Sequence, residues 1–109
     1  MAYSSFLDNY QQQVKAGLWI KKGVDPISHC ALGLTGEAGE VADLIKKDQY
    51  EPAKTYSDLA LAQELGDVFW YGTNLATLIG YPIEKIFRMN ILKLQQRHAA
   101  KEVYDINKL

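Results

Sequence analysis

Two pairs of acidic residues share one spacing in this chain: Glu37 with Glu40, and Glu64 with Asp67. In a helix, residues three apart lie side by side on one surface. On a helical wheel, Glu37 and Glu64 fall within the apolar arcs of their segments, and Glu40 and Asp67 lie at the edges. If the two arcs face each other, the carboxylates converge and need a cation. Oxygen ligands without His or Cys select Mg²⁺, Mn²⁺ or Ca²⁺.

A third polar set is Asn90, Lys93 and Arg97, whose spacing of i, i+3 and i+7 places them on one helix face. Lys and Arg neutralise and orient phosphate oxygens, and Asn binds sugar, base or phosphate. The alternative without a ligand is a buried ion network that pairs the acids with these basic side chains. The i,i+3 spacing repeated on two segments favours the metal, because a scattered network would not require it.

Four segments with helical periodicity position these residues: 4–19, 26–47, 57–79 and 82–100. Asp25 before Pro26 predicts the N-cap of the second helix, and Ser57 that of the third. Gly80 is expected just past the end of the third helix. The sequence therefore predicts one all-α domain over residues 1–109. Its four-helix bundle has a small core, so self-association is expected.

Composition sets the class of protein and excludes several partners. Hydrophobic residues make up 48% and charged residues 23% of the 109 residues, which is typical of a soluble globular domain. The net charge of −1 predicts neither a nucleic-acid partner nor an anionic membrane. A single cysteine, Cys30, and the lack of a signal peptide or a membrane span indicate a cytoplasmic protein.

The acidic motifs also have a family resemblance. GLTGEAGEV at 33–41, followed by ELGDV at 64–68, resembles the MazG-like nucleotide pyrophosphohydrolases, whose hallmark is ExxE, a gap and ExxD. Here 23 residues separate Glu40 from Glu64. The resemblance implies an all-α fold that forms homodimers or homotetramers. It also implies Mg²⁺-dependent hydrolysis of nucleoside triphosphates to monophosphates and pyrophosphate, with Mn²⁺ as a substitute, in nucleotide-pool control or clean-up.

The resemblance assigns roles by position. It implies that the metal ligands and catalytic residues are Glu37, Glu40, Glu64 and Asp67. Tyr71, one turn beyond Asp67, looks like a tyrosine that touches substrate in dCTP-hydrolysing relatives. The residues implied to contact phosphate or sugar are Asn90, Lys93 and Arg97. Gly36 stands where many relatives have another Glu, which leaves the number of metal ions and the general base open.

Aromatic and glycine residues near the acids have two interpretations each. His29 and Trp19 are candidates for contact with a nucleobase, with a packing role as the alternative for His29. Trp70 is expected at a subunit interface, because large exposed aromatics mark association surfaces. Each helical glycine weakens its helix by about 1 kcal/mol, which favours close helix packing over ligand access as the compensation. The glycines that recur in the second helix are Gly33, Gly36 and Gly39.

Other functions predict different observations. A phosphoribosyl-ATP pyrophosphatase would share the fold and differ in substrate. A di-iron carboxylate bundle needs Glu-x-x-His on two helices, and neither His29 nor His98 follows a Glu by three. A non-enzymatic helical interaction module would pair its acids with Lys93 and Arg97 and would not respond to Mg²⁺ and a nucleotide.

Overall fold

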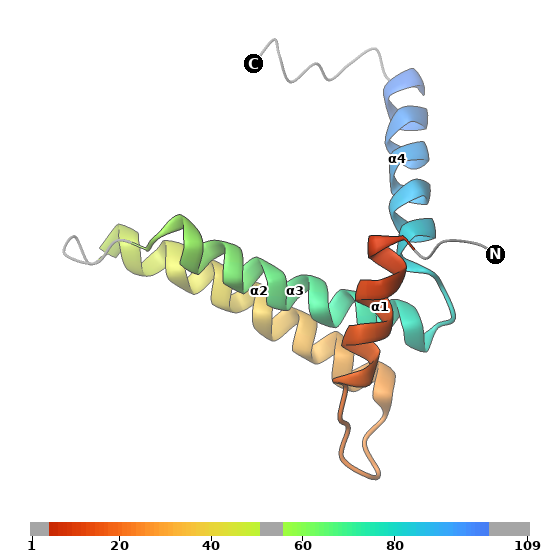
Figure 1. Cartoon of the computed structure of the whole chain (residues 1–109). Coiled ribbons are helices and arrows are strands. Elements are labelled where there is room, and N and C mark those ends of the chain that lie inside the picture. Colours follow the sequence, from red (N-terminus) through yellow and green to blue (C-terminus); the bar gives the residue numbers. More distant parts are fainter. Residues whose placement is uncertain (1–4, 51–55, 101–109) are drawn as a thin grey trace.

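The computed structural model describes residues 5–50 and 56–100, which form helices and turns without strands (Figure 1). The helices are α1 (Phe6–Ala16), α2 (Pro26–Tyr50), α3 (Asp58–Leu78) and α4 (Ile83–Ala100). The predicted all-α class is confirmed. α1 is shorter than expected because Ser5 caps its start and Gly17 its end, and α2 continues to Tyr50 rather than residue 47. Within the described ranges, no helix has the length and apolarity needed to cross a bilayer.

The starts of α2 and α3 are fixed by side-chain caps at the predicted positions. Asp25 accepts hydrogen bonds from the backbone N–H and the hydroxyl of Ser28, at 2.9 and 2.7 Å. These bonds, the hydroxyl's first, hold the pKa of Asp25 below its ordinary value. Ser57 accepts from the backbone N–H of Ala60 at 3.0 Å. Both caps satisfy donors that the first turn of a helix leaves without partners.

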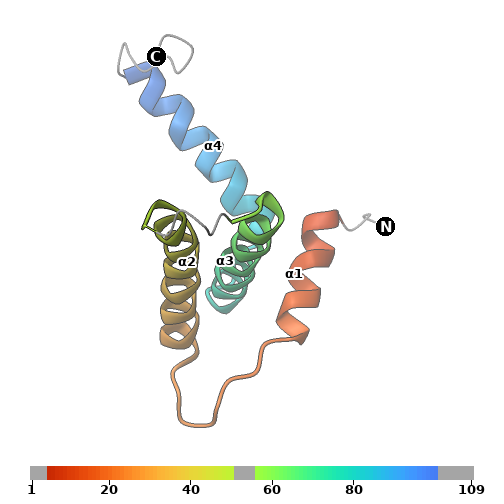
Figure 2. The same cartoon turned by 90° about the vertical axis from the view of Figure 1, so that its left-hand side faces the viewer.

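α2 and α3 lie side by side and run antiparallel, as both views show (Figures 1 and 2). Among the described helices, α2 packs against α3 alone. The fully buried side chains are Cys30 on α2 and Asn74 on α3, and burial raises the pKa of the Cys30 thiol. This helix pair is the frame on which the acidic motifs are placed.

α1 lies across the C-terminal half of α3, where one side chain joins three segments. The Gln11 amide nitrogen donates to the Thr77 hydroxyl at 3.0 Å and to the Tyr81 carbonyl at 2.9 Å. Its amide oxygen accepts from the backbone N–H of Ile83 at 2.8 Å. Gly80, with a φ of +80°, turns the chain between Thr77 and Tyr81 as predicted. Gln11 therefore ties α1 to the end of α3 and the start of α4.

α4 leaves the α2–α3 pair soon after it begins (Figures 1 and 2). It contacts α1 and α3 but not α2, and Ile83 at its start is buried. Every described side chain over residues 87–98 is exposed. The four described helices therefore do not enclose one shared core, although their number and class match the expectation.

Candidate metal centre

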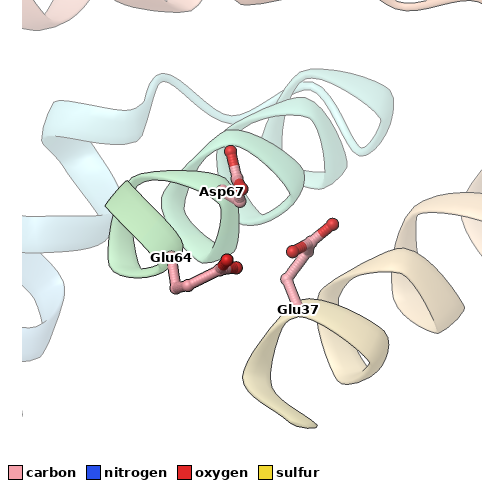
Figure 3. A group of neighbouring side chains, drawn as sticks. All are labelled: Glu37, Glu64 and Asp67. Atoms are coloured by element: carbon pink, nitrogen blue, oxygen red, sulfur yellow. The ribbon is translucent and has the colours of Figure 1, made fainter. Parts of the chain in front are cut away.

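Three of the four predicted acidic ligands face one another between α2 and α3 (Figure 3). Glu37 projects from α2 toward Glu64 and Asp67 of α3, and one carboxylate oxygen of each lies within 4.8 Å of the others. We call these three residues the acid cluster. Glu37 and Glu64 are half-buried and Asp67 is exposed, so the cluster opens to solvent on the side of Asp67.

Glu40, the fourth predicted ligand, is exposed and lies outside this group of oxygens. It follows Glu37 by three residues, so it sits beside Glu37 on α2, at the border of the face turned toward α3. Its charge still raises the pKa of Glu37, although less than Asp67 and Glu64 do. The structure therefore places Glu40 at the margin of the acid cluster.

The electrostatics of the acid cluster are those of uncompensated like charges. Partial burial first, and then the charges of Asp67 and Glu64, raise the pKa of Glu37 above its ordinary value. Among the described residues, no Lys, Arg or His forms an ion pair with the acid cluster; the pairs observed are Lys47 with Asp43, and Arg88 with Glu84. A divalent cation would relieve this repulsion, and an all-carboxylate donor set fits Mg²⁺, Mn²⁺ or Ca²⁺.

An aromatic group borders the acid cluster one turn further along α3. Tyr71 meets Trp70 edge-on, with ring centroids 4.9 Å apart and an interplanar angle of 80°. His29 of α2 lies with its ring centroid 6.3 Å from that of Tyr71. Two residues predicted to contact substrate, His29 and Tyr71, are thus neighbours. Trp70 is half-buried beside Tyr71 rather than fully exposed, and its predicted place at a subunit interface stays a prediction.

Gly33 explains how the Tyr71 ring reaches this position. A Cβ atom at Gly33 would lie 2.5 Å from the ring atoms Cδ1 and Cζ of Tyr71, closer than real Cβ contacts. The absence of a side chain therefore lets the ring lie directly against α2. Close packing, the favoured interpretation of the glycines, holds for Gly33. It does not hold for Gly36 and Gly39, where an added Cβ would meet open space.

The predicted phosphate-binding residues lie away from the acid cluster in this chain. Asn90, Lys93 and Arg97 are all exposed on the part of α4 that leaves the helix pair. Trp19, in the loop between α1 and α2, is also exposed, with 77% of its surface accessible. The structure therefore brings together the acids, His29 and Tyr71, but not the residues of α4.

Tyr10 of α1 is a neighbour of the acid cluster that sequence analysis missed. It is half-buried and lines one groove with Gly66, the residue before Asp67. Burial first, and then the charge of Asp67, raise the pKa of the Tyr10 phenol. Its spacing with Phe6 and Val14 marks it as one more residue on the apolar face of α1, and nothing in the sequence indicates that α1 crosses α3 beside Asp67.

Comparison with known proteins identifies the family. The model of the MazG nucleotide pyrophosphohydrolase domain matches residues 27–101, which hold every residue of the acid cluster. The chain belongs to the MazG family. The Gene 37 protein of Mycobacterium phage L5 is 35% identical over 79 residues, which cover 68% of each chain. No solved structure matches this MazG chain.

The MazG match begins at residue 27, at the start of α2, and leaves α1 outside it. Tyr10 and Gln11 are therefore additions to the matched segment, one beside the acid cluster and one as the anchor of α1. The matched segment also includes α4, so this MazG chain carries its basic residues within the family domain but apart from its acids.

Proposed function

We propose that this protein hydrolyses nucleoside triphosphates to monophosphates and pyrophosphate, with Mg²⁺ bound at the acid cluster and Mn²⁺ as a substitute. The observation that supports this most is the acid cluster itself. Its carboxylates converge from two facing helices, within the segment matched by the MazG model, with no paired cationic side chain among the described residues. Such a site has both the charge and the donor atoms that a hard divalent cation requires.

The residues of this chain have separate roles in the proposal. Glu37 and Glu64 hold the cation from opposite helices, Asp67 holds it at the exposed side where a triphosphate would enter, and Glu40 contributes from the margin. When bound, Mg²⁺ supplies charge neutralisation of phosphate oxygens and a water of lowered pKa. Positioning and charge neutralisation are what phosphoryl transfer mainly demands of a protein.

The aromatic group is the proposed site of the nucleobase. Tyr71 follows Asp67 by four residues and His29 lies beside it, so a base stacked there leaves its phosphates near the acid cluster. The exposed indole of Trp19 offers a further stacking surface from the loop. We place this activity in the cytoplasm, where a lone buried cysteine such as Cys30 stays reduced.

Self-association is part of the proposal. Large apolar side chains are exposed on several helices, among them Phe6 with 79%, Leu32 with 73% and Phe69 with 58% of their surfaces accessible. Patches of this kind on a folded chain mark interaction surfaces. We propose a homodimer or homotetramer, with no nucleic-acid partner and no membrane.

The test is pyrophosphate release with Mg²⁺ from a panel of common and modified nucleoside triphosphates, with phosphoribosyl-ATP included. We expect release from nucleoside triphosphates and loss of at least about 100-fold in kcat for Glu64→Gln, since one charged ligand to the metal is removed. Glu84→Gln is the matched control, because Glu84 pairs with Arg88 on the surface of α4. Undiminished release from Glu64→Gln would contradict the proposal, and release from phosphoribosyl-ATP alone would favour the related pyrophosphatase.

A further inference from the structure

Asn74 of α3 is fully buried, and its side-chain amide makes no hydrogen bond with the described part of the chain. Its exposed fraction is 0%, and neither the amide nitrogen nor the amide oxygen has a partner within residues 5–50 and 56–100. A buried amide without partners costs free energy, because both of its groups lose their hydrogen bonds to water. In a folded protein such a group has a specific explanation, such as a functional contact or a bound water.

Two polar side chains close to Asn74 in the fold are satisfied by the chain itself. Thr73 is also buried, with 3% of its surface exposed, and its hydroxyl donates to the Phe69 carbonyl at 2.6 Å. Gln11 uses its amide for three hydrogen bonds, one of them to Thr77, which lies one turn beyond Asn74. The unpaired amide is therefore particular to Asn74 and not a general property of this part of the fold.

The contact of Gly33 with Tyr71 shows which residues face each other across α2 and α3. The two helices run antiparallel, so the next turn brings Cys30, three residues before Gly33, opposite Asn74, three residues after Tyr71. Cys30 is likewise fully buried. A side chain in a helix leans toward the turn on its N-terminal side, so the Asn74 amide is directed back toward Tyr71. The amide therefore lies behind the aromatic group, in the interior of the helix pair.

Asp67, Tyr71 and Asn74 form a line along the side of α3 that faces α2. At about 100° per residue, they lie within about 60° of one another around the helix. Asn74 follows Asp67 by seven residues, which is about 10 Å along the axis at about 1.5 Å per residue. A nucleotide with its phosphates at the acid cluster and its base at Tyr71 extends in the same direction. The far edge of its base would then be directed at Asn74.

We infer that Asn74 determines the base specificity of this protein, because its amide binds the hydrogen-bonding edge of the nucleobase. An amide offers one donor and one acceptor side by side. It is complementary to a base with an amino group next to a ring nitrogen, or a carbonyl next to a ring N–H, as in the pairing of Asn with adenine. The inference rests on the proposed function for the place of the base, and on the buried, unpaired amide for the contact.

The Tyr71 ring must move for a base to reach Asn74. The ring lies directly against α2 because Gly33 has no side chain, so the space that it fills suits a flat ring. An aromatic residue in a helix has two common χ1 rotamers, so the ring can turn outward without a change in the backbone. The base takes the place of the ring against Gly33, stacks on the turned ring and brings its edge to Asn74.

Nucleotide binding without turnover tests the inference. Calorimetry with Mg²⁺ measures the Kd of non-hydrolysable α,β-imido triphosphates of adenine, guanine, cytosine and uracil. The comparison ligands are the same triphosphates of purine and pyrimidin-2-one, which lack the exocyclic group on this edge. We expect the wild type to bind at least one natural base about 10-fold more tightly than the unsubstituted base of the same ring type, as a paired donor and acceptor provide.

Variants assign this preference to Asn74. Asn74→Leu should bind the natural and the unsubstituted base equally. Thr73→Val is the matched control and should keep the preference, because the buried Thr73 hydroxyl bonds only to its own helix. Without nucleotide, Asn74→Leu should melt at the temperature of the wild type or above it, since two unpaired polar atoms are removed. An Asn74→Leu variant that melts lower and keeps the preference would overturn the inference, as would a wild type without any preference.

A further measurement uses the wild type alone and does not depend on the folding of a variant. In NMR spectra, the side-chain amide signals of Asn74 should shift when the preferred nucleotide binds and stay in place with the unsubstituted base. Signals that respond equally to both ligands would overturn the inference. Preferential binding without pyrophosphate release from any nucleoside triphosphate would instead contradict the proposed function alone. Pyrophosphate release with no difference in Kd between natural and unsubstituted bases would overturn this inference alone.

Discussion

A substitution at Gly33 tests the contact between α2 and α3 directly. In Gly33→Ala, the added methyl group would lie 2.5 Å from Cδ1 and Cζ of Tyr71, so either the ring or the helices must shift. The ring has little freedom, because Trp70 meets it edge-on at 4.9 Å and His29 lies on another side at 6.3 Å. Gly39→Ala on the same helix is the control, since its methyl group would meet nothing within 4 Å.

The magnitude follows from two opposing effects. Replacing a helical glycine by alanine stabilises the helix by about 1 kcal/mol. Overpacking a filled contact costs about 1–3 kcal/mol. Gly39→Ala should therefore raise the free energy of unfolding by about 1 kcal/mol. Gly33→Ala should range from nearly neutral to about 2 kcal/mol less stable, which separates the two variants by about 1–3 kcal/mol.

Urea unfolding followed by circular dichroism measures both variants, and each is repeated with Tyr71→Ala. Removing the ring removes the clash, so Gly33→Ala should become stabilising in that background while Gly39→Ala is unchanged. The displaced ring should also raise the KM for nucleotide without a matching fall in kcat. Equal stabilities for Gly33→Ala and Gly39→Ala, or a penalty that persists without the Tyr71 ring, would refute the reasoning.

Three further predictions concern the hydrogen bonds of Gln11, the pKa of Tyr10 and the pKa of Glu37. Gln11→Ala should lower the free energy of unfolding by about 2 kcal/mol in chemical denaturation, because three hydrogen bonds are lost. Gln11→Glu should be intermediate. An unchanged denaturation midpoint for Gln11→Ala would contradict the role of Gln11 in joining α1 to α3 and α4. Asp67→Asn should lower the pKa of Tyr10 toward its ordinary value, because the nearby negative charge is removed, as read by NMR of labelled tyrosine with Tyr81 as reference. Glu37, whose folded pKa is raised, adds stability in full below the ordinary pKa of Glu and loses it as pH rises through the raised value. Metal-free Glu37→Gln should therefore melt higher than wild type at neutral pH and gain nothing from Mg²⁺; the same melting profile for both proteins would contradict this.

Helical periodicity and caps were enough to predict the elements of the fold. Ser57 and Asp25 mark the starts of α3 and α2, and Gly80 marks the turn before α4, because local hydrogen bonds and φ preferences decide them. The i,i+3 spacing placed Glu64 and Asp67 on one face for the same reason. The packing between the helices could not be predicted from the sequence, because it depends on contacts between residues far apart in the chain.

Individual residues show where that limit lies. The amide of Gln11 spans 66 to 72 positions to reach its partners, and no local pattern distinguishes it from Gln12 or Gln13. The spacing of Tyr10 predicts only a residue on the apolar face of α1, although its phenol lies near Asp67. Lys93 shares a predicted face with Arg97, but the direction in which α4 leaves the helix pair decides whether either one meets the acids.

The tie formed by Gln11 uses a neutral amide, which neither gains nor loses a proton and is scarcely affected by ionic strength. Neighbouring carboxylates, by contrast, change their charge state with acidity and with cation loading. The anchoring of the first helix is consequently insulated from the titration of the nearby acids. A chelator or a rise in pH can therefore change the electrostatic field around Asp67, while the hydrogen bonds of Gln11 keep α1, and with it Tyr10, in place.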